Sequence, residues 1–422
     1  MNRFIFFAPS IPNEWRLIPN KYLFQSHSSK VGKAYSNYSL LSLTTRGVAI
    51  KNINSKDGKL PESFEGYQTV EPGDMIFCLF DLDMSAVFSG LSNYGGMITS
   101  AYEVFKVNKD YLTPAYAKYW FEYVFSGRYY KNFSKNIRYT IGSDAFGQII
   151  TPCPNLEEQK AIADFLTKKT FKIDQLISNQ EKQIEKLKEY RQAIITKAVT
   201  KGLDPNVPMK DSGIEWIGEI PNNVNVSSVK NFYDITLGKM LQPKQENEND
   251  TLEYYFCAAN LGNNCLKTNN LKQMWFSVKE KEKYSLKRGD LLVVEGGDVA
   301  SSSIIGTDVS NIYFQNSIHR VRPIHGLNEY LHYYLIFVKG SGYFDVNCNK
   351  ATIMHFTKDE FSNLPFLIRN IEEQKKIVTF LNKEETKINR LISIKEKKIE
   401  FLTNYKKSLI YEYVTGKKRV SL

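Results

Sequence analysis

The chain has 422 residues, which suits two to four domains and is long enough to bury sizeable cores. It carries 56 Lys and Arg against 45 Asp and Glu, and a net charge of +11 indicates a polyanionic partner, most often nucleic acid. No apolar run could span a bilayer or serve as a signal peptide, and five scattered cysteines suit a reducing cytoplasm better than disulfides or a zinc site.

Residues 1–154 are rich in aromatic residues, with short apolar runs bounded by Gly, Asn, Asp and Pro, a pattern typical of strands and loops with few helices. Several clusters combine basic, polar and aromatic side chains, which neutralise phosphates and read base edges. For any single member, a solvated charge or a half-buried tyrosine is the simpler interpretation, so the clusters carry the prediction. The candidate DNA contacts in this segment are Lys33, Tyr35, Tyr38, Thr45, Arg46, Arg128, Tyr129, Tyr130, Lys131, Lys135, Arg138 and Tyr139.

Residues 155–205 are predicted to be helical. Asn155 is a typical N-cap residue, and Glu158 three positions later completes an Asn-based relative of the capping box. We expect a short helix, a break between Lys168 and Phe171, and then a helix of about 30 residues, or about 45 Å, that stops near Gly202.

Residues 206–369 are similar in size and composition to the first segment. Both contain an Ile-Pro-Asn sequence near the start, and both contain a Pro/Arg-Gly-Asp turn that leads into an apolar run, so two modules of one fold are expected. The candidate DNA contacts of the second segment are Lys239, Lys244, Lys267, Lys272, Gln315, Asn316, His319, Arg320, Lys350, Thr352 and His355.

The helical sequence occurs twice. Residues 370–422 repeat it at an offset of about 215 residues without a gap, which indicates a duplicated unit comprising half of the chain. Apolar residues at 4-3 spacing predict a coiled-coil seam, in which the polar residues at two positions specify the pairing at some loss of stability. The seam residues are Ile173, Ile177, Ile184, Leu187, Ile194, Ile388, Ile392, Ile399, Leu402 and Leu409.

No catalytic constellation is evident. The chain has no Gly-rich phosphate loop and no dinucleotide-type glycine motif. Two sets of carboxylates could hold a nuclease metal ion, but turn and loop roles explain them better, and the five histidines show no metal-ligand spacing. The carboxylates are Asp74, Asp81, Asp83, Asp290, Glu295 and Asp298.

Three stretches make the chain resemble the specificity subunit of a type I restriction–modification system. They are residues 152–166 (with Pro-Asn-Leu-Glu-Glu-Gln-Lys) and the long helix after them, residues 210–221 (Lys-Asp-Ser-Gly-Ile-Glu-Trp-Ile-Gly-Glu-Ile-Pro), and residues 364–374. The resemblance covers essentially the whole chain. Its two departures are Arg369 where Pro154 stands in the first copy, and Val224 where Trp15 stands.

The resemblance implies a non-catalytic reader of double-stranded DNA. It also implies an α+β fold, in which two mixed α/β target recognition domains are separated by two long helices packed as an antiparallel coiled coil, with a pseudo-two-fold duplication. The expected domains are residues 1–154 and 206–369 for recognition, and 155–205 and 370–422 for the helical spacer. A rod of about 45 Å corresponds to roughly 13 base pairs, so a split, asymmetric site is expected.

The implied partners are two methyltransferase subunits and the motor-nuclease subunits. S-adenosylmethionine, ATP and Mg are expected on those partners, with no cofactor bound by this chain. Two alternatives remain open. The chain could serve a fused methyltransferase–nuclease, or it could be a basic nucleic-acid-binding scaffold without a restriction role.

Overall fold

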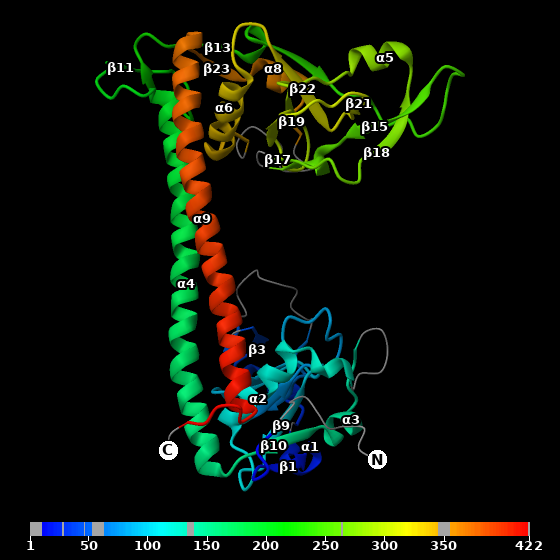
Figure 1. Cartoon of the computed structure of the whole chain (residues 1–422), viewed down its shortest axis with the longest axis vertical. Helices are drawn as coiled ribbons and strands as arrows, with labels where there is room; N and C mark the ends of the chain where they lie inside the picture. Colours follow the sequence, from blue (N-terminus) through cyan, green and yellow to red (C-terminus); the bar gives the residue numbers. More distant parts are fainter. Residues whose placement is uncertain are drawn as a thin grey trace. The chain divides into compact units, whose positions relative to one another are not determined.

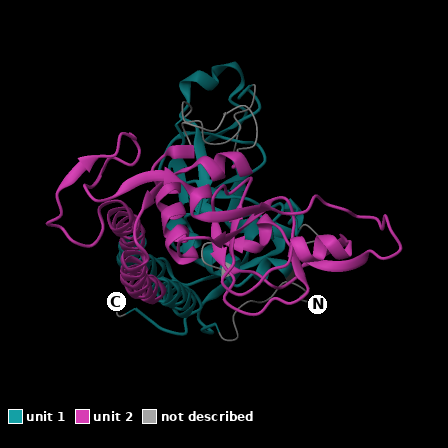
Figure 2. Cartoon of the chain, turned by 90° about the horizontal axis from the view of Figure 1, so that it is seen from above, with its two compact units in different colours: residues 1–181, 396–422 teal, residues 182–395 magenta. Residues whose placement is uncertain are grey.

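A computed structural model describes residues 11–27, 29–45, 47–52, 63–132, 139–262, 265–344 and 355–420. The chain forms two compact units, residues 1–181 with 396–422 (unit 1) and residues 182–395 (unit 2), coloured separately in Figure 2. Each unit contains one aromatic-rich module together with part of each long helix. The boundaries between the units therefore cross both helices, and the predicted four-part division into modules and spacers remains a prediction.

The module of unit 1 is built on a four-stranded antiparallel sheet with the order β2-β9-β6-β7. Helix α2 (Pro114–Ser126) supplies Trp120 and Phe121 to a core that also contains Phe77 of β6, whose ring centroid lies 4.8 Å from that of Phe121. The other pairs are β1-β10, β3-β4 and β5-β8. The bounds are β1 Arg16–Pro19, α1 Asn20–Leu23, β2 Phe24–Ser26, η1 Gly32–Asn37, β3 Leu41–Thr44, β4 Gly47–Ile50, β5 Gln68–Val70, β6 Met75–Phe77, β7 Ser89–Leu91, β8 Gly96–Ile98, β9 Glu103–Val107, η2 Tyr129–Asn132, α3 Ser143–Gln148 and β10 Ile150–Cys153.

The module of unit 2 repeats this plan. Its four-stranded antiparallel sheet has the order β14-β22-β19-β20, its 13-residue helix is α6 (Asn328–Gly340), and β13 pairs with β23 as β1 pairs with β10. Unit 2 also has a three-stranded sheet, β18-β15-β21, and the two-stranded pairs β11-β12 and β16-β17. The bounds are β11 Met209–Asp211, β12 Glu219–Pro221, β13 Asn225–Ser228, η3 Val229–Asn231, β14 Tyr233–Leu237, β15 Thr251–Phe256, η4 Ala258–Asn260, β16 Leu261–Gly262, β17 Cys265–Leu266, β18 Lys272–Phe276, α5 Val278–Lys283, β19 Leu291–Val294, β20 Ser302–Ile304, β21 Ile312–Phe314, β22 Ile318–Pro323, α8 Lys358–Asn363 and β23 Pro365–Ile368.

The two long helices are continuous. Helix α4 (Leu156–Lys201) has 46 residues and α9 (Ile371–Val414) has 44 (Figure 1). The expected break between Lys168 and Phe171 was wrong. No Gly or Pro interrupts this stretch. Thr170 is buried, and its hydroxyl lies 3.3 Å from the Tyr119 hydroxyl of the module. Tertiary packing therefore keeps the residues between Lys168 and Phe171 helical.

The predicted N-caps are confirmed. The Asn155 side chain accepts a hydrogen bond from the Glu158 backbone N–H at 2.8 Å, and Asn370 accepts from Glu373 at the same distance. The Glu158 carboxylate does not complete a capping box but accepts from the Trp15 indole at 3.2 Å. This glutamate therefore ties the helix start to the module.

Both helices end at glycines, as predicted. Gly202 and Gly416 adopt φ of +80° and +72°, the left-handed conformation that commonly terminates a helix.

At the other end, each helix start is joined to its module by a buried glutamine. The Gln159 side chain accepts from the Thr113 backbone N–H at 2.7 Å, and Gln374 accepts from Leu327 at 3.0 Å. Thr113 and Leu327 are the N-cap residues of α2 and α6, so the same joint is built in both units.

The helices pair antiparallel within each unit. In unit 1, the Lys406 ammonium lies 3.0 Å from the Asp174 carboxylate, and in unit 2, Arg191 donates to the Asn389 side chain. The predicted seam residues are all at least half-buried, which is what a helix–helix interface requires. Ile173, Ile184, Ile388, Leu402 and Leu409 are buried, and Ile177, Leu187, Ile194, Ile392 and Ile399 are half-buried.

None of the helices described is both long enough and apolar enough to cross a membrane.

Candidate nucleic-acid interface

In unit 2, several loops meet at one end of the four-stranded sheet, where β14 and β19 end and β22 begins. The Asn316 backbone N–H donates to the Lys239 carbonyl at 2.9 Å, and the Glu295 N–H donates to the Ser317 carbonyl at 3.0 Å. The Phe356 N–H in turn donates to the Glu295 carbonyl at 2.6 Å. We call residues 238–242, 295–297, 315–317 and 355–356 the loop end of unit 2. It brings together polar residues from four separate parts of the chain.

Loops from separate parts of the chain also meet at the corresponding end of the sheet in unit 1. The Ile141 backbone N–H donates to the Leu79 carbonyl at 2.8 Å, directly after β6. The Lys131 ammonium lies 3.2 Å from the Asp83 carboxylate and 4.6 Å from the ring centroid of Tyr139. Residues 78–88, 128–131 and 139–141 therefore form the loop end of unit 1. The predicted cluster from Arg128 to Lys131 lies within it.

The candidate contacts differ in their exposure to solvent. Those that are exposed can reach a ligand without rearrangement, whereas the half-buried ones can contact it only along one edge. Exposed candidates are Lys33, Tyr38, Thr45, Arg128, Lys244, Lys267, Lys272 and His355; half-buried ones are Tyr35, Tyr129, Lys131, Tyr139, Gln315 and Asn316. Arg46, Lys135, Arg138, Lys350 and Thr352 lie outside the described residues.

Arg320 was predicted to contact DNA, and its position contradicts this. The residue is only 6% exposed, because β22 is a central strand of the sheet. Its guanidinium donates to the carbonyls of Lys283 and Ser285 at 2.9 and 2.8 Å and lies 5.6 Å from the ring centroid of Phe314. Arg320 therefore joins β22 to the end of α5 instead of reading a base.

Three further candidates are wrong for the same reason, burial. His319 is fully buried, its Nε2 lies 2.8 Å from the Phe356 carbonyl, and burial lowers its pKa to about 4. Lys239 is buried, and its ammonium donates to side chains within unit 2. Tyr130 is buried with its ring 5.7 Å from that of Phe125. All three side chains are therefore largely covered by the rest of their unit.

Two half-buried tyrosines support the packing of unit 1. The Tyr129 ring lies 5.1 Å from that of Tyr123, which itself stacks on Tyr411 of α9 at 5.5 Å. Tyr35 packs on Phe64 at 6.0 Å. Part of each aromatic cluster therefore serves the fold, and the exposed cations beside them remain the better candidates for DNA contact.

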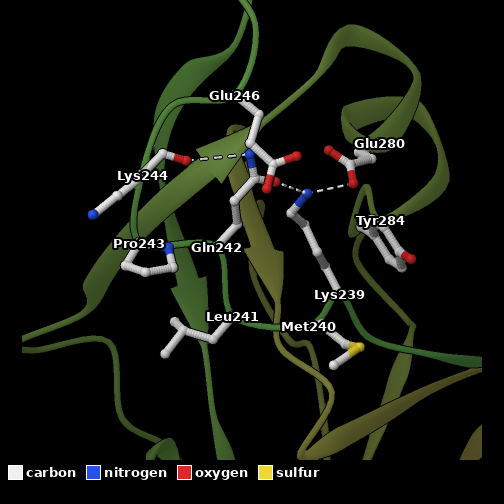
Figure 3. Close-up of a pocket in the computed structure, with 9 residues that line it drawn as sticks. All are labelled: Lys239, Met240, Leu241, Gln242, Pro243, Lys244, Glu246, Glu280 and Tyr284. Carbon is white, nitrogen blue, oxygen red and sulfur yellow. Dashed lines mark hydrogen bonds and ion pairs between the residues drawn. The ribbon is translucent and has the colours of Figure 1, made fainter.

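A cavity of about 470 Å³ opens beside the loop end of unit 2 (Figure 3). The Lys239 ammonium reaches into it and donates to Gln242 at 2.6 Å and to Glu280. Burial opposes ionisation of Glu280, but the hydrogen bonds from Lys239 and Ser277 outweigh it and lower the Glu280 pKa. The pairing of Lys239 with Glu280 could not be predicted from the sequence, because the two residues lie far apart in the chain.

The same loop carries two apolar side chains into solvent. Met240 is 75% exposed and Leu241 is 54% exposed, and both lie at the rim of the cavity in Figure 3. Neither was among the predicted contacts, because the prediction was based on clusters of basic, polar and aromatic side chains.

Most of the carboxylates considered for a nuclease site are engaged in turns and ion pairs. The Asp74 carboxylate accepts from the Glu71 backbone N–H at 2.7 Å, and Asp290 accepts from Arg322 at 2.7 and 2.8 Å. Over the described part of the chain, no three His, Cys, Asp or Glu residues are placed to hold a metal ion.

Residues 221–404 match the family model described as the type I restriction modification DNA specificity domain. The chain is similar to the type I restriction enzyme MjaVIII specificity subunit of Methanocaldococcus jannaschii, with 29% identity over 297 residues, 65% of this chain and 63% of that protein. It is also similar to the putative type I restriction enzyme MjaX specificity subunit of the same organism, with 26% identity over 324 residues, 74% of this chain and 70% of that protein. The match thus spans less than two thirds of the first relative.

The fold is also found in a solved structure. A chain from a study of complex assembly and conformational transition in a type I R-M system superposes with a TM-score of 0.71 over 96% of this chain and 99% of that chain, at 14% identity. At this identity the likeness concerns the fold, and it confirms the predicted α+β architecture with long helices.

Proposed function

We propose that this chain is a type I restriction–modification DNA specificity subunit that reads one bipartite DNA site. The observation that carries the proposal is the duplication of one module with different loop ends. Both units keep the same sheet order and the same helix joint, whereas their exposed polar side chains differ. Each loop end would contact one half of the site, and the half-sites would therefore differ in sequence.

In this proposal the chain binds DNA without performing a chemical step. The exposed cations beside the loop ends, such as Arg128 and Lys244, would neutralise phosphates and position each module, while side chains at the loop ends would read bases. Methylation and cleavage would belong to partner subunits, which would bind S-adenosylmethionine, ATP and Mg.

Exposed apolar patches on the helices support docking of two copies of one partner. In unit 1, Leu176 of α4 and Tyr405 of α9 are 45% and 48% exposed. In unit 2, the residues at the repeated positions, Leu391 and Tyr190, are 45% and 52% exposed. Each unit therefore exposes the leucine of one copy of the repeat and the tyrosine of the other copy, taken from opposite helices.

Both patches have the same surroundings. The contact between Lys406 and Asp174 places Tyr405 at the level of Leu176, and the contact between Arg191 and Asn389 places Tyr190 at the level of Leu391. One further apolar residue extends each patch, Phe401 in unit 1 and Ile394 in unit 2. Exposed lysines and carboxylates both lie on the same helices nearby, so a partner surface with an apolar centre and a rim of both charges would suit both patches. They are Lys169, Lys172, Lys398, Asp174 and Glu400 in unit 1, and Lys186, Lys197, Lys387, Glu185 and Glu189 in unit 2.

Substitution of one patch is expected to remove one methyltransferase subunit. Leu176→Asp with Tyr405→Asp places two charges in an apolar contact, and native mass spectrometry of the purified complex should then show one methyltransferase copy where the wild type has two. Leu391→Asp with Tyr190→Asp should remove the other copy. Gln175→Asp with Asn404→Asp, exposed positions of the same helices, is the control and should retain both. Two copies in both patch variants would contradict this docking surface.

Exchange of a module tests the proposed function itself. Replacing residues 1–154 by the module of another family member should change one half of the methylated sequence and leave the other half intact, as read by methylome sequencing. Inserting four helical residues after Glu181, about 6 Å, should lengthen the unread spacer and leave the bases unchanged. A module exchange that altered both half-sites would contradict independent reading.

A further inference from the structure

We propose that Asn316 reads a base edge in the half-site contacted by unit 2, with Met240 and Leu241 packed against the adjacent groove. This inference rests on the proposed function and names its specificity residues. It begins from the position of Asn316, in the short connection between β21 and β22 at the loop end of unit 2.

The backbone around Asn316 is held on both sides. Its own N–H donates to the Lys239 carbonyl at 2.9 Å, and the Gln315 N–H donates to the Phe256 carbonyl at 2.9 Å. The Asn316 side chain is half-buried, and within the described ranges its amide has no hydrogen-bond partner. A fixed backbone therefore presents an unused amide donor and acceptor at the end of the sheet.

The neighbouring polar groups are already engaged. The Gln315 side chain accepts from the Ser317 hydroxyl at 3.0 Å, and that hydroxyl accepts from the Ala258 N–H at 3.0 Å. The Lys239 ammonium is held by Gln242 and Glu280. These contacts stiffen the surroundings of Asn316 and leave its amide as the group best placed to bind a ligand.

The loop beside Asn316 is rigidly attached, which explains how it keeps two apolar side chains in water. The Trp275 N–H donates to the Gln242 carbonyl at 3.1 Å, and the Asp250 carboxylate accepts from the Asn247 N–H at 3.1 Å. Met240 and Leu241 lie exposed on this loop, and a bound partner would remove their apolar surface from water. Apolar side chains of this kind pack on thymine methyl groups or between base steps.

The charges of the loop indicate where the duplex would lie. Lys244 is exposed and suits a phosphate, whereas Glu246 and Glu248 are exposed and would repel one. The groove would therefore lie over residues 240–244 and Asn316, away from residues 246–248. An asparagine amide offers one donor and one acceptor, which match the N6 and N7 positions of adenine in the major groove.

The test uses the complex of the full chain with its methyltransferase, on duplexes carrying the methylated site found for the wild type. Asn316→Ala should weaken binding on the order of tenfold to a hundredfold and relax the preference at one position of the half-site read by unit 2. Asn316→Asp should shift that preference towards cytosine, whose N4 amino group is a donor. Met240→Ser with Leu241→Ser should weaken binding to the same half-site only.

The control is Asn222→Ala, an exposed asparagine of unit 2 far along the chain from the loop end, and it should bind as the wild type does. Thermal unfolding midpoints equal to the wild type establish that each variant is folded. This inference is overturned if Asn316→Ala discriminates between sequences as the wild type does, or if it loses affinity equally on all sequences. Either result leaves the proposed function intact. A wild-type complex that methylates no bipartite site overturns both.

Discussion

Replacing Arg369 by Met is expected to lower the free energy of unfolding of unit 2 by about 3–5 kcal/mol. The Arg369 side chain is fully buried, pairs with Glu373, and donates to the carbonyls of Val199 and Thr200 at 3.4 and 2.8 Å. These carbonyls belong to the last turn of α4, where no further helical N–H can satisfy them. Removal of the guanidinium leaves the Glu373 carboxylate and the buried Thr200 carbonyl without their partner, while the Val199 carbonyl keeps only the Tyr330 hydroxyl at 3.4 Å.

Urea unfolding of the purified chain would measure the loss, and hydrogen exchange at residues 196–201 would locate it. The control is Arg419→Met in unit 1. Arg419 pairs with Glu158 at the start of the equivalent helix, but its side chain is 44% exposed, so about 1 kcal/mol or less is expected. If both substitutions lowered the free energy of unfolding by the same amount, burial would not explain the stabilising contribution of Arg369.

Acid is expected to destabilise unit 2 through two buried histidines. Burial lowers the pKa of His319 and of His332 to about 4. In the unfolded chain these histidines take up protons below about pH 6.5, whereas in the folded chain they do so only near pH 4. The free energy of unfolding is therefore unaffected by them above about pH 6.5 and decreases as the pH falls from there towards 4. Between pH 7 and 5 the expected loss is about 2 kcal/mol for each histidine.

Unfolding midpoints measured from pH 7 to pH 5 would test this. His332→Gln should remove about half of the acid-dependent loss, although it lowers stability at pH 7, because the 2.8 Å contact between Ser302 and the His332 ring is lost. His325→Gln, at an exposed position in the same unit, should leave the pH dependence unchanged. A pH dependence that persists in full in His332→Gln would show that other groups cause it.

The sequence by itself determined the duplication and the ends of the long helices. These depend on neighbouring residues only: the asparagine cap at Asn155 or Asn370, the 4-3 spacing of apolar residues, and the glycine stops at Gly202 and Gly416. Local rules of this kind act through the backbone of the helix itself, so they can be read without knowledge of the rest of the chain.

Only the tertiary structure decided which polar residues are available at the loop ends. Arg320, His319 and Lys239 resemble DNA contacts in sequence, yet their strands and loops place them in the interior, where each is bound by a carbonyl or a carboxylate from a distant segment. The same holds for Arg369, which replaces a proline in the repeat and is bound by α4 carbonyls about 170 residues earlier in the chain. Burial and long-range pairing depend on how strands are ordered in the sheet, and residue type at a single position does not encode that order.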